Sequence, residues 1–325
     1  MNRYARQNLV PQFGVGAQDR LRTAHVLVVG AGGLAVPVLQ YLTGAGVGRI
    51  SIVDPDVVEE SNLHRQTLFV HADIGRLKAS VAAQKMRQLN PEVDFVEHIC
   101  ALDPGNVAAQ VQDVDLVLDC ADSVGVSYTL SDHCLTANIA MISASVVGLS
   151  GYCGGFCHVA PSLRAVFPDP PNQMANCATD GVLGPVVGVV GGLQAQMAIA
   201  ALVGLTPSPL GQIVSFDSTQ YRFGSFRFDT APEPEIGFPF VAAEMLHSTD
   251  FIIDLRATHE ASLAHPTAVR IQVADIAAGG QMPRDDQRVV LCCQTGLRAW
   301  QAAEKLTQVW PGQIVLAALG IKSFN

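Results

Sequence analysis

Short runs of apolar residues alternate with longer segments of mixed polarity over the first part of the chain. Buried parallel strands are predicted at residues 26–29, 49–53, 93–99 and 115–122. The segment at 78–89 has the pattern of a helix, and Asn90-Pro91 ends it. Strands that alternate with helices are typical of a mostly parallel sheet covered by helices, so we expect an α/β fold with a Rossmann-like sheet.

Further strands are expected at residues 139–159, 212–217 and 221–228, and they close a first domain. A proline-rich, polar stretch then predicts an extended linker. After it, largely apolar runs at 251–256, 268–273 and 289–292 predict a second, small parallel sheet, followed by an amphipathic helix to Val309. We therefore predict domains at 1–229 and 240–325, with a linker at 230–239.

The segment 181–204 is almost entirely apolar, and its glycines at 184, 188 and 192 have the spacing of small residues in packed membrane helices. Gln194, Gln196 and Pro185 argue against a membrane span, as does the lack of basic flanking residues. A core or dimer helix is the favoured interpretation, and no membrane association is expected.

Composition narrows the class of protein. The 325 residues are 49% apolar and 15% charged, which is typical of a soluble globular protein of two domains. A net charge of −9 and a pI of about 5.4 argue against non-specific nucleic-acid binding, so a protein or small-molecule partner is expected. The N-terminus has no apolar signal core, and the eight cysteines include no C-x-x-C pair, so we expect a cytoplasmic protein with reduced thiols.

A glycine turn follows the first predicted strand directly. Gly30, Gly32 and Gly33 allow a phosphate to approach the backbone, and the next helix offers free N–H groups. Asp54, at the end of the second strand, suits a carboxylate that accepts hydrogen bonds from a ribose hydroxyl. Ala35 replaces the third glycine of the usual fingerprint, so the turn alone leaves a dinucleotide and a mononucleotide open.

The residues just beyond Asp54 favour a mononucleotide triphosphate over a dinucleotide. Asn62, Arg65 and Gln66 place polar and cationic groups where a triphosphate would lie, although a solvated loop arginine is the simpler alternative. The motifs GxGGL and DxDxVxxSNLxRQ resemble the ThiF/MoeB/HesA family of ubiquitin-activating-type adenylating enzymes over about residues 1–228. The resemblance implies activation, with ATP, of the C-terminal glycine of a small ubiquitin-like sulfur-carrier protein that ends in Gly-Gly.

The resemblance also implies roles for single residues. Arg6 would reach the ATP phosphates of a neighbouring protomer, which implies a homodimer; an exposed N-terminal arm is the alternative. Lys78 would contact phosphate, and Asp122 would hold the magnesium ion of ATP, unless Asp122 only caps a helix. Two positions depart from the family: Ser123 replaces the usual asparagine and Ser127 a frequent arginine.

Cys177 lies in a polar, glycine-rich loop before a helix, where a thiol can be a nucleophile, although a lone loop cysteine is often inert. The resemblance implies that it takes the acyl group or a persulfide in some relatives. Relatives often carry two C-x-x-C pairs for structural zinc. Ser162 and Ala165 stand at two of those ligand positions, so no zinc is expected.

The predicted loop after the strand at 289–292 carries Cys293 and Arg298 at a helix N-terminus. Backbone N–H groups and an arginine around one sulfur are expected to depress its pKa and to stabilise an anionic persulfide. The pattern IIDLRxxxE…VVLCCQTGLRA resembles the rhodanese sulfurtransferases. A rival interpretation starts from Cys292, as in protein phosphatases, but their preceding histidine is Leu291 here. The domain is short for a rhodanese, so reduced activity is expected.

The two resemblances together imply one reaction sequence. Adenylation of the carrier carboxylate would be followed by attack of a Cys293 persulfide, giving a thiocarboxylate for a pathway such as thiamin or molybdopterin biosynthesis. The sulfur donor would be a cysteine desulfurase or thiosulfate. Two alternatives stay open: a carrier-binding scaffold with little or no catalysis, and an NAD-dependent oxidoreductase on the same Rossmann-like unit.

Overall fold

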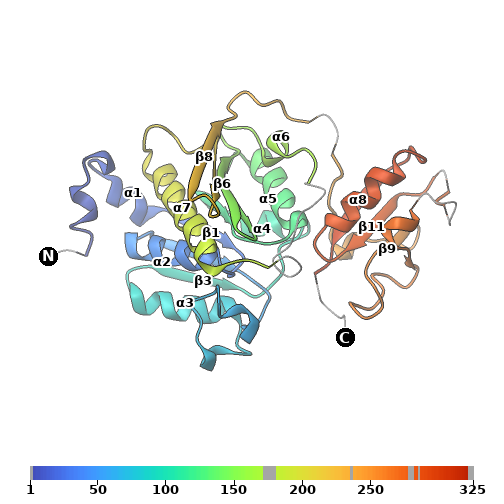
Figure 1. Ribbon diagram of the computed structural model, residues 1–325, viewed down its shortest axis with the longest axis horizontal. Helices are drawn as coiled ribbons and strands as arrows, with labels where there is room; N and C mark the ends of the chain where they lie inside the picture. The colour runs from blue at the N-terminus through green and yellow to red at the C-terminus, as the bar shows by residue number, and fades with distance from the viewer. Residues whose placement is uncertain (1–2, 171–180, 235–236, 277–281, 285, 321–325) are drawn as a thin grey trace.

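A computed structural model describes residues 3–170, 181–234, 237–276, 282–284 and 286–320 of the chain (Figure 1). It contains two separate sheets. The larger has eight strands in the order β3-β2-β1-β4-β5-β6-β7-β8, and the smaller has four in the order β10-β9-β11-β12. The predicted mixed α/β fold with a mostly parallel, Rossmann-like sheet is confirmed.

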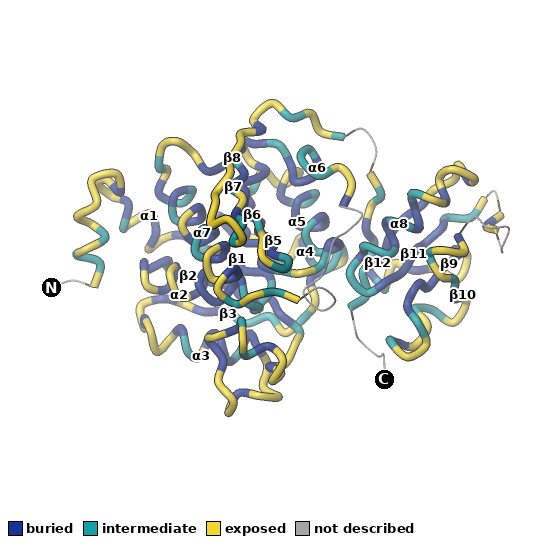
Figure 2. The backbone as a smooth tube through the Cα atoms, in the orientation of Figure 1, coloured by how far each residue is buried: buried dark blue, intermediate teal, exposed yellow. Residues whose placement is uncertain are grey.

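Five strands of the large sheet are parallel and three are antiparallel. The parallel strands are β1 (His25–Val29), β2 (Arg49–Val53), β3 (Asp94–His98), β4 (Leu116–Asp119) and β5 (Ala140–Val147). The antiparallel strands are β6 (Ser150–Phe156), β7 (Gln212–Asp217) and β8 (Arg222–Arg227). The pattern of apolar runs had placed β2 and β7 at these same bounds. Strand β8 is the exposed edge of the sheet (Figure 2).

Helices cover both faces of this sheet. One group consists of α1 (Ala17–Thr23), α2 (Ala35–Ala45), α3 (Lys78–Leu89) and α7 (Gly184–Val203), and the other of α4 (Val107–Gln110), α5 (Val124–Ala137) and α6 (Leu163–Val166). Successive residues of β1 feed the two cores in turn: Val26 and Val28 pack with the first group, Leu27 and Val29 with the second. Short 3₁₀ turns lie at Gln7–Leu9, Pro11–Phe13, Glu60–Asn62, His71–Asp73, Ala243–Met245 and Val273–Asp275.

Helix α7 is, within the described residues, the one helix long and apolar enough to cross a membrane, and half of that apolar stretch is buried. It packs against α2, β5 and β6 of the first domain. Its buried Gln194 donates hydrogen bonds to the backbone oxygens of Asp119 and Ile142, at 2.8 and 3.1 Å. These contacts are those of a core helix that connects β4 and β5.

The small sheet is entirely parallel, with β9 (Phe251–Asp254), β10 (Val269–Arg270), β11 (Val289–Cys293) and β12 (Ile314–Ala318), and α8 (Leu297–Leu306) packs on it. The strand expected at 268–273 is shorter than predicted. After Arg270 the chain leaves the sheet and turns at Val273–Asp275 against α8, where Lys305 Nζ donates to the Val273 oxygen. The apolar run therefore ends in packing on a helix instead of in pairing with a strand.

The second domain packs on α5 of the first. Val124 and Tyr128 of α5 belong to the same apolar core as Trp300 of α8. The rings of Tyr128 and Trp300 stack with their centres 5.4 Å apart, and Phe238 meets Trp300 edge-on. Helix α5 thus packs with one side against the core of the first domain and with another against the second domain.

Candidate active site

The glycine turn lies between the ends of two parallel strands. Gly30 follows β1, and its N–H donates to the Val53 oxygen at the end of β2. Its φ of +89° is a left-handed conformation, and a Cβ there would lie 2.8 Å from the Cys120 oxygen just after β4. Only glycine fits this position without strain, because both the backbone angle and the neighbouring chain exclude a side chain. The turn therefore keeps its backbone open at the carboxyl edge of the sheet.

Asp54 lies directly beside this turn. Its carboxylate accepts hydrogen bonds from Ala31 N at 2.6 Å and Asp56 N at 2.8 Å, and burial raises its pKa. Both contacts fix the carboxylate at the end of β2, at the place where a ribose would meet it. Its role in binding ribose stays a prediction.

The Asn62–Gln66 segment packs against the other side of the turn. A Cβ on Gly33 would lie 3.4 Å from the Arg65 oxygen, and one on Gly32 would lie 3.8 Å from Gln66 Nε2. Gln66 is buried, and its Oε1 has no hydrogen-bond partner among the described residues. An unpaired buried amide oxygen beside a glycine turn fits a site that a polar ligand completes.

Two further polar residues belong to the same neighbourhood. Lys78 starts α3, and its Nζ lies 3.0 Å from an Asp56 carboxylate oxygen, which links it to Asp54. Arg65 donates to the Ser61 oxygen and lies against His64, whose backbone oxygen would be 2.5 Å from a Cβ on Gly184. Asn62 Oδ1 accepts from Glu59 N and closes the 3₁₀ turn before Arg65. Lys78 is thus connected to Asp54 through Asp56, and Arg65 lies next to Gly33 of the glycine turn.

Arg6 does not join this group in its own chain. The flanking residues Tyr4 and Gln7 bind Asn90 and the Ala45 oxygen, at the ends of α3 and α2 remote from the glycine turn. The N-terminal residues lie at the side of the first sheet that is far from the second domain (Figure 1). This position agrees with the expectation that Arg6 serves a neighbouring protomer, which stays a prediction.

The end of β4 carries two carboxylates in different surroundings. Asp119 is fully buried, accepts from Ser143 Oγ at 2.8 Å and Ala121 N at 3.2 Å, and burial raises its pKa to about 6. Asp122 is exposed. The cap of α5 is Ser123, whose Oγ accepts from Val126 N, so the alternative of Asp122 as a helix cap is wrong. Sequence reasoning did not single out Asp119, because only its complete burial distinguishes it from other strand-end carboxylates.

A cavity of about 90 Å³ opens beside Asp122. Its walls include Ser127, Ser143 and Tyr152 from the first domain and Thr295 and Leu297 from the second. No cluster of three or more His, Cys, Asp or Glu side chains lies close enough to hold a metal within the described ranges. Asp122 alone offers one carboxylate, which fits a magnesium ion whose other ligands are phosphate and water.

Cys293 ends β11, and the next residues form a tight loop around its sulfur. Its Sγ accepts from Gly296 N at 3.1 Å and Ala299 N at 3.4 Å. The side chain is 1% exposed, and this burial raises the thiol pKa, although the two N–H groups and the charge of Arg298 act to lower it. The expected depressed pKa is therefore wrong for the thiol in this arrangement, because loss of water outweighs the favourable dipoles.

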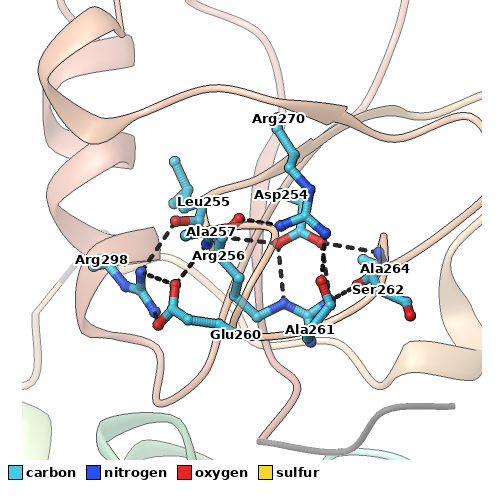
Figure 3. Close-up of polar contacts among 10 residues, drawn as sticks. All are labelled: Asp254, Leu255, Arg256, Ala257, Glu260, Ala261, Ser262, Ala264, Arg270 and Arg298. Carbon is cyan, nitrogen blue, oxygen red and sulfur yellow. Dashed lines mark hydrogen bonds and ion pairs between the residues drawn. The ribbon is translucent and has the colours of Figure 1, made fainter.

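Arg298 does not bond to the sulfur. Its guanidinium donates to both Glu260 oxygens, at 2.9 and 2.8 Å, and to the Leu255 oxygen (Figure 3). The Arg298 charge holds the pKa of Glu260 down to about 2. The Asp254–Arg256 ion pair is buried in the same network, so the IIDLRxxxE pattern fixes the wall of the Cys293 loop.

The remaining cysteine candidates are placed differently. Cys292 is fully buried and packs with Leu246, Ile252 and Val290 on the other face of the small sheet. That orientation supports a structural role for Cys292 and argues against the phosphatase interpretation. Cys177 lies outside the described residues.

The two positions assigned to lost zinc ligands belong to a hydrogen-bonded contact with the linker. Ser162 N and Oγ both donate to the carboxylate of Glu233, and Ser162 Oγ accepts from Ala165 N. Nearby, Arg164 Nη2 donates to the Phe238 oxygen at 3.3 Å. The linker is thus held to α6 by polar contacts of this chain's own residues.

Comparison with known proteins is consistent across sequence and fold. The ThiF family model matches residues 4–237. The adenylyltransferase and sulfurtransferase MOCS3 of Sus scrofa is 44% identical over 229 residues, which are 68% of this chain and 49% of that protein. The adenylyltransferase and sulfurtransferase uba4 of Emericella nidulans is 41% identical over 242 residues, 68% and 49% of the two chains. This chain therefore spans about half the length of these relatives.

A third relative aligns over nearly the whole chain. The MOCS3 protein of Drosophila sechellia is 32% identical over 368 residues, covering 98% of this chain and 81% of its own length. Among solved structures, MccB of E. coli with AMPCPP and MccA has a TM-score of 0.65 at 24% identity, covering 73% of this chain and 74% of that one. MccB with ATP gives 0.63 at 25% identity, with the same shares. These structures share the fold of the first domain.

Proposed function

The chain belongs to the ThiF family, and from this premise we propose that it adenylates the C-terminal glycine of a ubiquitin-like sulfur carrier and then delivers sulfur to it. ATP is the activating substrate. The product is a carrier thiocarboxylate. The relatives named adenylyltransferase and sulfurtransferase support both halves of this activity.

One observation carries the proposal: the turn between β4 and α5 contacts both the glycine turn and the Cys293 loop. Cys120 and Ala121 lie against Gly30 of the glycine turn. Ser123 and Gly125, a few residues on, bond to Thr295 in the Cys293 loop. Asp122 lies between the two contacts. A nucleotide centre and a sulfur centre that share one turn are suited to consecutive steps on one substrate.

In the first step, a carboxylate oxygen of the carrier attacks the α-phosphorus of ATP, and the bond to the bridging oxygen breaks to release pyrophosphate. Arg65 and Lys78 stabilise the charge that develops on the phosphates, and Arg6 of a partner protomer supplies a third cation. Asp122 would hold a magnesium ion, which would neutralise phosphate charge. Asp54 orients the ribose, and the backbone of Gly30 to Gly33 faces the phosphates.

In the second step, the outer sulfur of a Cys293 persulfide attacks the acyl carbon. A C–S bond forms, the C–O bond to AMP breaks, and AMP leaves with the electron pair. A second thiol, for which Cys177 is the candidate in the sequence, then cleaves the S–S bond and frees the thiocarboxylate. The resulting disulfide is reduced by an external dithiol. A cysteine desulfurase or thiosulfate loads the persulfide.

ATP–pyrophosphate exchange with a panel of Gly-Gly-ended carriers tests the first step, each carrier being supplied with and without its terminal glycine. We expect exchange only with an intact glycine. Asp122→Ala should lower the exchange rate by about 100-fold or more, since it removes a group that binds charge in the transition state. Cys293→Ala should abolish thiocarboxylate formation.

Each alternative predicts a different result. Carrier binding without any exchange, in a folded sample, would identify a scaffold and contradict the adenylation step. Tight binding of NAD without turnover of ATP would indicate an oxidoreductase. Thiocarboxylate formation by Cys293→Ala at the wild-type rate would refute the sulfur-transfer step alone.

A further inference from the structure

The two domains meet where the Cys293 loop touches the first turn of α5. Gly125 N donates to the Thr295 oxygen at 2.9 Å, and Ser123 Oγ donates to the same oxygen at 3.2 Å. A helix N-terminus has unpaired N–H groups, so a carbonyl placed there satisfies one of them. The loop that carries the sulfur is therefore bonded to the turn that carries Asp122.

This contact is possible because Gly125 in α5 and Gly296 in the Cys293 loop have no side chains. A Cβ on Gly125 would lie 2.4 Å from Ala318 Cβ and 3.1 Å from the Phe240 ring. A Cβ on Gly296 would lie 3.0 Å from Gly125 N. Gly125 is the second residue of α5, and its lack of a side chain is what allows Ala318, Phe240 and Gly296 to approach this turn so closely.

The contact also closes one cavity. The space beside Asp122 is bounded by Ser143 and Tyr152 of the first domain and by Thr295 and Leu297 of the second. Without the second domain, this cavity would be open to water on the side of Leu297. The docked arrangement thus places the residues next to Cys293 in the wall of the space beside Asp122.

We propose that each chain delivers sulfur to the adenylate on its own Asp122 centre, with Gly125 as the positioning residue that seats the Cys293 loop. This inference rests on the proposed function and specifies its geometry: the persulfide and the acyl adenylate that it attacks belong to one chain. The C–S bond forms, and AMP departs, in the cavity that the two domains of that chain enclose.

Complementation between two inactive chains tests this directly. Asp122→Ala and Cys293→Ala chains are co-produced with different affinity tags, and assemblies that contain both are isolated. They are supplied with ATP, thiosulfate and the carrier found in the exchange assay. Delivery within a chain predicts that thiocarboxylate formation stays at the background level of either variant, because neither chain has both centres. Pyrophosphate exchange continues on the Cys293→Ala chain.

Recovery of thiocarboxylate formation in the mixed assemblies would overturn the assignment, since sulfur would then pass between chains. Recovery that falls on dilution would identify collisions between molecules and overturn it equally. Absence of exchange in the wild type as well would instead refute the proposed adenylation, and this inference with it. The exchange assay therefore separates the two failures.

Gly125→Leu gives a second, independent measurement. The added side chain collides with Ala318 and Phe240, so the second domain cannot seat, whereas the glycine turn is untouched. We expect sulfur transfer to fall about 100-fold, as for a misplaced reacting group, with pyrophosphate exchange within about twofold of the wild type. Gly44→Leu is the matched control, because a Cβ at Gly44 in α2 meets no atom within 4 Å. Sulfur transfer by Gly125→Leu at the rate of this control would contradict the proposal.

Discussion

At the scale of single residues, the environment of a carboxylate decides how it responds to pH. Asp119 is fully buried at the end of β4, and burial raises its pKa from 3.8 to about 6. Between these values the folded state binds a proton that the unfolded state does not, so this carboxyl lowers stability as the pH rises from about 4 to 6. The loss is complete about one pH unit above the folded-state pKa and is constant at higher pH.

Asp119→Asn should remove this dependence. The amide oxygen still accepts from Ser143, but no charge is buried, so the difference in unfolding free energy between the variant and the wild type should shift by up to about 3 kcal/mol in favour of the variant between pH 4 and 6.5. Denaturant unfolding at several pH values measures it. Asp19→Asn, an exposed carboxyl on α1, is the control and should give parallel curves. Parallel curves for Asp119→Asn would refute the assignment.

The sequence predicted the position of some site residues but not the chemical environment of others. Gly30 and Asp54 were predicted at one edge of the sheet because each follows an apolar run, and parallel strands end at the same edge. The role of Lys78 was implied only by the family resemblance. The direction of the pKa shift of Cys293 could not be predicted. Its desolvation comes from the complete packing of the loop, whereas the N–H groups that favour the thiolate can be recognised locally.

At the scale of elements, α6 and the linker are connected by hydrogen bonds. The sequence had indicated for this region only that the usual zinc ligands are missing. Arg164 binds Asp132 of α5 through two hydrogen bonds of 2.6 and 2.9 Å. Its guanidinium lies 4.5 Å from the Tyr128 ring centre and 5.6 Å from that of Trp300 in the second domain. One side chain thus joins α5, α8 and the linker.

Arg164→Met should therefore weaken the junction between the domains. The substitution keeps much of the volume but loses the ion pair, the bond to Phe238 and both ring contacts, and we expect a loss of about 2–3 kcal/mol. Unfolding midpoints and the rate of proteolysis in the linker 230–239 measure the change. Arg22→Met, which breaks an exposed ion pair with Asp19, should change stability by less than about 0.5 kcal/mol. Equal effects of the two substitutions would contradict this role of Arg164.

The bounds of elements could be predicted where the pattern ends at a turn signal. Helix α3 begins and ends as expected because Asn90-Pro91 follows it. The strand β10 was overestimated, because the apolar residues after Arg270 pack on α8 and no local signal separates helix packing from strand pairing. Only the tertiary context distinguishes the two.

At the scale of the whole molecule, the loop that buries Cys293 is also bonded to the first domain. The side chain is 1% exposed and its thiol pKa is raised, so alkylation by iodoacetamide should be slower at Cys293 than at the partly exposed Cys100. Gly125→Leu should accelerate labelling of Cys293 without changing that of Cys100. Mass spectrometry of labelled peptides over time follows both. Equal rates at the two cysteines in the wild type would show that the domains are not docked in solution.

This docking could not be read from the sequence. Gly125 and Thr295 are far apart along the chain, and neither belongs to a motif that signals an interface. Each domain resembles a separate family, and such resemblances predict what lies inside a domain. Ser123 and Ser127 were visible as departures from the family, but the hydrogen bond from Ser123 to the Thr295 oxygen became clear only from the structure.

The burial of Cys293 has a kinetic consequence for any reaction that passes through it. Cys293 is 1% exposed while Thr295 is bonded to α5, so in the proposed sulfur transfer a donor protein would reach the sulfur only after this loop opens. Charging and discharging of the cysteine would then be separated in time. The desulfurated donor would depart before the acyl group is captured, which is a ping-pong order with respect to the donor.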